Sequence, residues 1–155
     1  MEKKVVKEKV VPLEIAVLLK AKGFDYKIES FYNYIPPAAS IKSKGGYKSV
    51  LRSYVAYSNS EWESVYKNVK ESFWKGLDDK HPNISAPTYS MAIDFLLEKG
   101  YHVMAVTELV KGENRWTWAY TDFKLGEEVL GKLSKEVNDR YTALNKGMLE
   151  VLKKL

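Results

Sequence analysis

The sequence predicts an α+β fold in which two antiparallel β-hairpins form one sheet, with helices packed on one face of that sheet. The first observation behind this prediction is the helical spacing of apolar residues in segments that end at Gly23 and Gly100. The second is the alternation of aromatic and polar residues in the segments that follow these glycines. The third is the presence of Gly- or Pro-containing turns that close those segments.

The chain has the usual size and composition of one domain, with 155 residues, of which 45% are hydrophobic and 29% are charged. We therefore expect a single domain over 1–155, with a charged, frayed lead-in at 1–11 and loops at 36–46 and 77–86. The absence of cysteine excludes disulfides and thiolate metal sites. The N-terminus lacks the apolar block of a secretory signal, and no segment is apolar enough to cross a membrane. We expect a cytoplasmic protein without a membrane partner.

The first half of the chain predicts a helix, a hairpin and a second helix. The first helix follows Pro12 and ends at Gly23, and an aromatic strand over 24–35 follows it. The returning strand is expected at 47–57. The sequence Ser58-Asn59-Ser60 then offers an N-cap for a helix over 61–75.

The second half repeats this order of elements. A helix after Pro87 ends at Gly100, and strands over 101–109 and 115–123 are joined by a turn at 111–114. The segment 125–155 is expected to be helical, with a break near Asn138-Asp139. If that helix were unbroken, its apolar heptads would predict a homodimer through the 125–155 helix.

The two helix-to-strand junctions resemble each other, since Lys22-Gly23-Phe24 and Lys99-Gly100-Tyr101 both consist of lysine, glycine and an aromatic residue. The chain can therefore be divided into tandem helix–strand–strand–helix units. A second interpretation stays open, because any helix that runs into a strand needs a glycine cap and then an apolar residue.

The sequence contains no motif that predicts catalysis. No phosphate-binding glycine loop is present, and neither His81 nor His102 lies in a hydrolytic motif. His81 with Asp78 and Asp79 has no standard metal-ligand spacing. We predict no catalytic residue, no cofactor and no metal, and an enzyme of unrecognised class is the least favoured alternative.

The candidate binding residues are aromatic and basic residues of the two predicted hairpins. Interleaved aromatics and positive charges hold single-stranded nucleic acid, and the chain carries a net charge of +5. The charge is almost all lysine and is dispersed, so the alternative is a half-buried sheet under a solubilising surface. The candidates are Tyr26, Tyr32, Tyr34, Lys44, Tyr47, Lys48, Arg115, Trp116 and Trp118.

The segments 84–89 and 93–100, with the opening at 12–24, resemble a group of small uncharacterised proteins encoded by phages and mobile elements of gut bacteria. The Trp/Tyr strand and the terminal segment 141–155 fit the same pattern. This resemblance implies a phage or prophage origin and transfers no functional residue. Because no chemistry is visible and aromatic surface is plentiful, we expect a protein that binds another protein, with nucleic-acid binding as the alternative.

Overall fold

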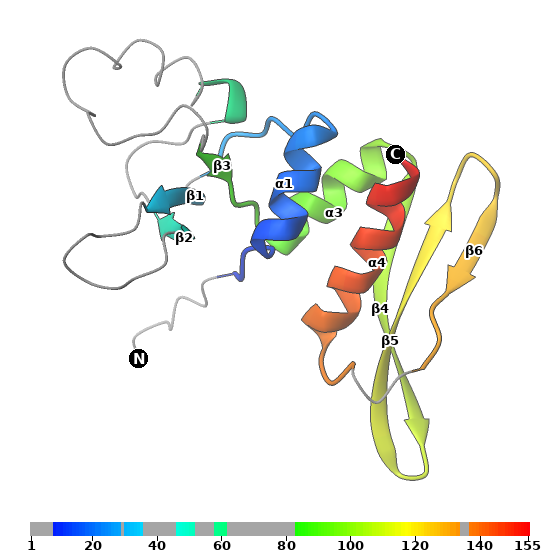
Figure 1. Cartoon of the computed structure of the whole chain (residues 1–155). Helices are drawn as coiled ribbons and strands as arrows, with labels where there is room; N and C mark the ends of the chain where they lie inside the picture. The colour runs from blue at the N-terminus through cyan, green and yellow to red at the C-terminus, as the bar shows by residue number, and fades with distance from the viewer. Residues whose placement is uncertain (1–7, 29, 36–45, 52–57, 62–82, 134–136) are drawn as a thin grey trace, which may run out of the picture. The chain divides into compact units, whose positions relative to one another are not determined.

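The computed structural model describes residues 8–28, 30–35, 46–51, 58–61, 83–133 and 137–155 (Figure 1). It confirms the α+β class. Its strands form two three-stranded antiparallel sheets, so the prediction of one shared sheet was wrong. Each predicted hairpin takes its third strand from its own part of the chain instead of pairing with the other hairpin. The chain divides into two compact units, Met1–Thr88 and Tyr89–Leu155, and each is described by itself. The single domain stays a prediction.

In the first unit, helix α1 (Leu13–Ala21) begins after Pro12 and ends at a glycine cap, as predicted. The N–H of Gly23 donates to Lys20 O at 3.0 Å, and the N–H of Phe24 donates to Leu19 O at 2.9 Å. These two bonds form the Schellman motif, which requires the left-handed backbone that Gly23 adopts at φ 88°.

The sheet of the first unit has the order β2-β1-β3, formed by β1 (Ser30–Ile35), β2 (Gly46–Leu51) and β3 (Ile84–Ser85). The hairpin of β1 and β2 confirms the predicted antiparallel pair, although β1 begins six residues later than the predicted start at 24. The loop predicted at 77–86 was wrong at its end, because β3 lies there and pairs with β1. The loop at 36–46 lies outside the described residues, apart from Gly46, which begins β2.

Residues 24–27 are tied to the start of a helix at 59–61, which is why they do not continue the strand. The Asn59 amide donates to Phe24 O at 2.8 Å and accepts from Ser85 N at 3.0 Å. Ser58 and Glu61 form a capping box, with Ser58 N donating to Glu61 Oε2 at 3.1 Å. The predicted N-cap is confirmed, and the rest of the predicted helix at 61–75 lies outside the described residues.

The N-terminal lead-in is ordered at its end, where the prediction of a frayed segment over 1–11 was wrong. Val11 is fully buried, and its N–H donates to Pro87 O at 2.9 Å. Val10 forms an antiparallel bridge with Thr88. Backbone pairing and apolar burial together hold these two residues, and residues 1–7 lie outside the described part of the chain.

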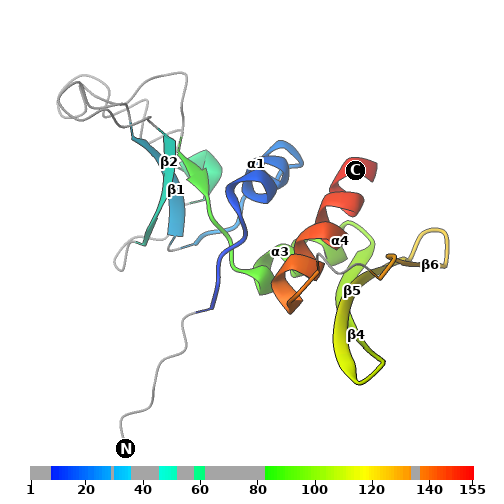
Figure 2. The ribbon, with the colours of Figure 1, turned by 60° about the horizontal axis from the view of Figure 1, so that its bottom comes forward.

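The second unit contains α3 (Tyr89–Glu98), β4 (Tyr101–Val110), β5 (Glu113–Asp122), β6 (Glu127–Leu130) and α4 (Arg140–Lys154). The strand order is β4-β5-β6, and α4 packs across β4 and β5 (Figure 2). The hydroxyl of Tyr89 joins α3 to α4 by donating to Asn145 Oδ1 at 2.8 Å. Helices therefore cover one face of this sheet.

The helical segment predicted over 125–155 was wrong in its first part, because 127–130 form strand β6. The predicted break is confirmed: Asp139 is the N-cap of α4 and accepts from Tyr141 N at 2.8 Å and Thr142 N at 3.0 Å. The apolar heptad residues of α4 are buried in the chain's own core, so they are not available as a dimer seam. These residues are Leu144, Met148 and Val151.

Candidate protein-binding arm

The outer half of the β4–β5 hairpin extends beyond the rest of its sheet, and we call its residues, Thr107–Trp116, the arm. The third strand stops short of it, because β6 ends at Leu130, opposite Ala119. The last backbone bond from this side joins Gly131 N to Trp118 O at 2.7 Å. Figure 1 shows the hairpin continuing past both β6 and α4. Within the described residues, the arm is a two-stranded ribbon.

A two-residue turn closes the arm. Lys111 and Gly112 both have positive φ, of 50° and 82°, as a type I′ turn requires. This turn matches the right-handed twist of the strands, so it sets a register in which Val110 lies opposite Glu113. The predicted turn at 111–114 was therefore two residues too long. Glycine suits its position, whereas Lys111 adopts a backbone that side chains disfavour.

The two faces of the arm differ in chemistry. Thr107 lies opposite Trp116, and Leu109 lies opposite Asn114, which places all four on the same face of the ribbon. Leu109 is 74% exposed and is the most exposed large hydrophobic residue among those described. Trp116 is half-buried. This face therefore presents an apolar pair at the end of a rigid support.

The charges of the arm balance one another. Glu108 lies opposite Arg115, while Lys111 lies in the turn and Glu113 follows it, so two acidic and two basic residues occupy the arm. The net charge of +5 thus comes from other parts of the chain. Nucleic-acid-binding ribbons need an excess of positive charge against phosphate, which the arm does not have. The arm therefore carries two apolar residues, Leu109 and Trp116, among charges that balance.

The structure separates the three candidate residues of the second hairpin. Arg115 and Trp116 lie on the arm, whereas Trp118 belongs to the packed part of the sheet. The Trp118 ring stacks on Tyr120 with centroids 6.0 Å apart and planes 2° apart. A Cβ atom on Gly131 would lie 2.5 Å from Trp118 Cε2, and one on Gly147 would lie 3.2 Å from Trp118 Cβ. Trp118 is half-buried and stays a predicted binding residue, although Gly131 and α4 pack closely against it.

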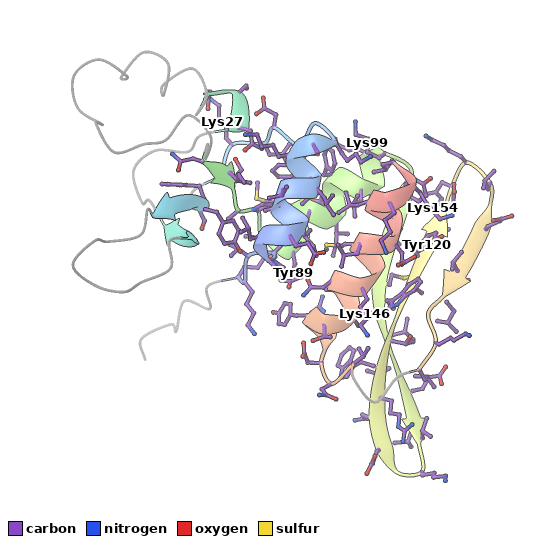
Figure 3. The ribbon with its side chains drawn as sticks, viewed as in Figure 1. Lys27, Tyr89, Lys99, Tyr120, Lys146 and Lys154 are labelled. Carbon is purple, nitrogen blue, oxygen red and sulfur yellow. The ribbon has the colours of Figure 1, made fainter. Side chains whose placement is uncertain are left out.

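The aromatic packing continues from Trp118 to the C-terminal end of α4. The rings of Tyr101 and Tyr120 meet edge to face at 6.2 Å. Lys154 places its Nζ 5.6 Å from the centroid of the Tyr120 ring (Figure 3). A cation over a tyrosine ring is attracted by the electrons of its face, so Lys154 closes this end of the core.

The described tyrosines of the first hairpin are also held by their own unit. The Tyr32 hydroxyl donates to Val11 O at 2.6 Å, and burial raises the pKa of that hydroxyl. The Tyr26 ring lies 4.7 Å from the ring of buried Phe24, outside β1. Tyr26 and Tyr32 therefore do not share one strand, as the aromatic ladder would need.

The other candidates of the first hairpin are placed by backbone register alone. Tyr34 lies opposite Tyr47, and Lys48 lies opposite Asn33. The pairing of Tyr34 with Tyr47 puts the two residues on the same face of the sheet. Lys44 lies outside the described residues. The Lys/Tyr surface predicted for nucleic acid stays a prediction.

The first unit carries one further cluster of polar groups, around Asp25. The carboxylate of Asp25 accepts from Ser60 N at 2.8 Å and from the Ser60 hydroxyl. Burial alone would raise the pKa of Asp25, but the hydrogen bonds from Ser60 outweigh it and lower the pKa. Lys27 forms an ion pair with Glu61 at 3.0 Å beside it. Each group in this cluster fixes residues 24–27 to the helix start, which is a structural role.

Sequence reasoning missed Leu109 and the whole of β6. Leu109 was counted only as the last residue of a strand, although an isolated leucine beside Glu108 and a Lys-Gly turn is a signal for an exposed tip. Gly126 and Gly131 bracket β6, and Gly126 has a φ of 69°. Two glycines that enclose a short apolar segment are a signal for a strand between turns.

Comparisons with known proteins assign no family to the chain: no family model, no curated protein and no solved structure matches it. Among the residues that the structure describes, no helix is long and apolar enough to cross a membrane. In the same residues, no group of three histidine, aspartate or glutamate side chains could hold a metal ion.

Proposed function

We propose that this protein works by binding another protein through the arm, with Leu109 and Trp116 as its apolar contacts. The observation that carries the proposal is the exposure of Leu109 at 74% on a ribbon that, among the described residues, no third strand supports. A two-stranded ribbon is marginally stable in water by itself, so it gains stability when a partner covers it. An exposed leucine beside a tryptophan suits an apolar groove on the partner.

The balance of charge on the arm favours a protein over a nucleic acid as the partner. With Glu108 opposite Arg115, the rim of the contact can form charge pairs with either sign on the partner. The phage or mobile-element origin that the sequence resemblance implies remains part of the proposal. Small proteins from such sources would meet host proteins as their partners.

The first experiment captures host proteins on the immobilised full-length chain and compares it with two variants. Leu109→Asp places a charge at the centre of the arm. The matched control is Leu97→Asp, which changes another exposed leucine, 45% accessible and in helix α3. We expect a host protein that binds the wild-type chain and Leu97→Asp but is lost from Leu109→Asp. Circular dichroism of the variants checks that all remain folded.

The second experiment repeats the comparison with the captured partner after purification. Isothermal titration with Trp116→Ala should show weaker binding by about tenfold or more, the usual loss for a tryptophan at the centre of an interface. A partner that binds Leu109→Asp with the same affinity as it binds the wild-type chain would contradict the proposal. Tight binding of single-stranded oligonucleotides that falls steeply with salt, and that both arm variants retain, would favour the Lys/Tyr alternative.

A further inference from the structure

The free edge of β6 carries the further inference. β6 is the last strand in the order β4-β5-β6, and within the described residues no strand pairs with its outer edge. Gly131 N donates to Trp118 O, so Gly131, Val129 and Glu127 direct their backbone groups toward β5. The alternation of an antiparallel ladder then directs the N–H and C=O groups of Glu128 and Leu130 outward, away from the sheet.

The side chains beside these outward groups form a short stripe of acid, apolar and basic residues. Glu128 and Leu130 alternate along β6, so they lie on the face of the sheet opposite Tyr120 and α4, and Lys132 follows two residues after β6 ends. Glu128 and Lys132 are exposed, and Leu130 is 58% exposed. A stripe with an apolar centre and opposite charges at its ends is complementary to itself when it is turned around.

We infer that β6 pairs antiparallel with β6 of a second copy of this chain, across a two-fold axis at Leu130. Leu130 then lies opposite the second copy's Leu130, and Glu128 lies opposite its Lys132. The two-fold axis repeats that charge pair on the other side. Outward N–H and C=O groups of both strands satisfy each other, and the two sheets become one continuous sheet.

The charges select this register over its neighbours. Sliding one strand by two residues would put Glu128 opposite the second copy's Leu130, which leaves the charge without an opposite partner. Sliding it by four residues would put the two copies of Glu128 opposite each other, which is repulsive. The register centred on Leu130 satisfies both charges and the leucine, which is why we choose a second copy over an unrelated extended segment as the occupant.

This dimer goes beyond the proposed function, because it uses β6 and leaves the arm free. Strand pairing over a few residues buries less area than a standard interface, so the dimer should be weak and depend on concentration. Each dimer would carry two arms, which strengthens binding to a partner that presents two sites.

Sedimentation velocity of the full chain, over a wide range of concentration, tests the inference. The wild-type chain should shift from monomer to dimer as its concentration rises. Glu128→Lys and Lys132→Glu each place like charges opposite one another, and each should raise the dissociation constant about tenfold. An equal mixture of these two variants should dimerise again, because each supplies the charges that the other lacks.

The double variant E128K/K132E restores complementary ends in reverse order, so it should dimerise as the wild type does. It also serves as the folding control, since it keeps the composition of the chain. A chain that stays monomeric at every concentration would overturn the inference, as would single charge reversals that leave the dimer unchanged. Leu109→Asp should dimerise normally, so failure of the arm proposal and failure of the β6 dimer are distinguishable.

Discussion

Trp116 and Trp118 lie two positions apart on the same strand and the same face of the sheet, yet their surroundings differ completely. Trp118 stacks on Tyr120 and lies where a Cβ on Gly131 or Gly147 would collide with it. Trp116 lies opposite Thr107 on the arm, beyond the last residue of β6. The two tryptophans share residue type, strand, face and half-buried state, yet different segments of the chain lie against them.

The difference shows that the reach of the third strand and of α4 decides which segments pack against each aromatic residue. β6 turns the inner half of the hairpin into a three-stranded sheet, and Gly131 and Gly147 let the chain approach Trp118 closely. Within the described residues, the outer half of the hairpin has no third strand and no glycine that brings another segment close to it. The same hairpin therefore supplies a packed region at one end and the arm, which we propose as a binding surface, at the other.

The largest effect is expected when each tryptophan is replaced in turn. Trp118→Ala should lower the free energy of unfolding by about 3 kcal/mol, because it leaves a cavity between β5, β6 and α4. Trp116→Ala should cost about 1 kcal/mol or less, because β6 ends before it and its ring lies on the two-stranded arm. Urea unfolding followed by circular dichroism measures both values. Equal losses would show that the two residues do not differ as described.

A second test asks whether Gly131 is what admits Trp118 to the core. Gly131→Ala places a methyl group 2.5 Å from the Trp118 ring and should cost about 1–3 kcal/mol. The matched control is Gly46→Ala in β2, where a Cβ meets nothing within 4 Å, and its effect should be about 0.5 kcal/mol or less. In a chain that already carries Trp118→Ala, the cost of Gly131→Ala should largely disappear. A cost that persists there would point to backbone strain instead.

A third test concerns Thr117, which lies between the two tryptophans on the other face. Its hydroxyl is fully buried and donates to Gly131 O at 2.9 Å, which fixes the chain after β6. Thr117→Val keeps the shape and removes this bond, so it should cost about 1 kcal/mol in thermal unfolding. Thr107→Val, at an exposed position of the arm, should be close to neutral. A neutral Thr117→Val would mean that water replaces the lost donor.

The smallest expected effect is an increase in the stability of the hairpin from a substitution at the turn of the arm. Lys111 has a φ of 50°, and asparagine adopts this backbone at lower cost, so Lys111→Asn should stabilise the hairpin by about 0.5 kcal/mol. Hydrogen exchange of the arm amides should slow while exchange in α4 stays unchanged. Lys111→Ala, which shares the disfavoured backbone without a local side-chain bond, should show no gain.

Much of the fold could be predicted from local signals. The junctions at Gly23 and Gly100 both have a positive φ, of 88° and 96°, and both close a helix before an aromatic residue, as the sequence indicates. Asp139 caps α4 at the predicted break, and Ser58 caps the helix start at 59. Such features depend on residues within a few positions of each other, so they are visible in the sequence.

The candidate site was predictable only in part. Arg115 and Trp116 were identified on the second hairpin, but Trp118 was grouped with them because alternation places it on the same face. β6 was assigned to a helix, because Leu130 begins an apolar repeat every seven residues that continues at Val137 and Leu144. Pairing with β5 overrides that local preference, since it satisfies the backbone and covers Trp118.

By itself, the sequence determined the α+β class, the helix ends and the two hairpins, because caps, turns and alternation act over short distances along the chain. Tertiary structure decided that there are two sheets, that 127–130 form a strand, and that Gly131 and Gly147 lie against Trp118 while Trp116 is on the arm. These outcomes depend on which distant segments come together. The physical reason is that burial and strand pairing are settled by neighbours in space, which local sequence does not specify.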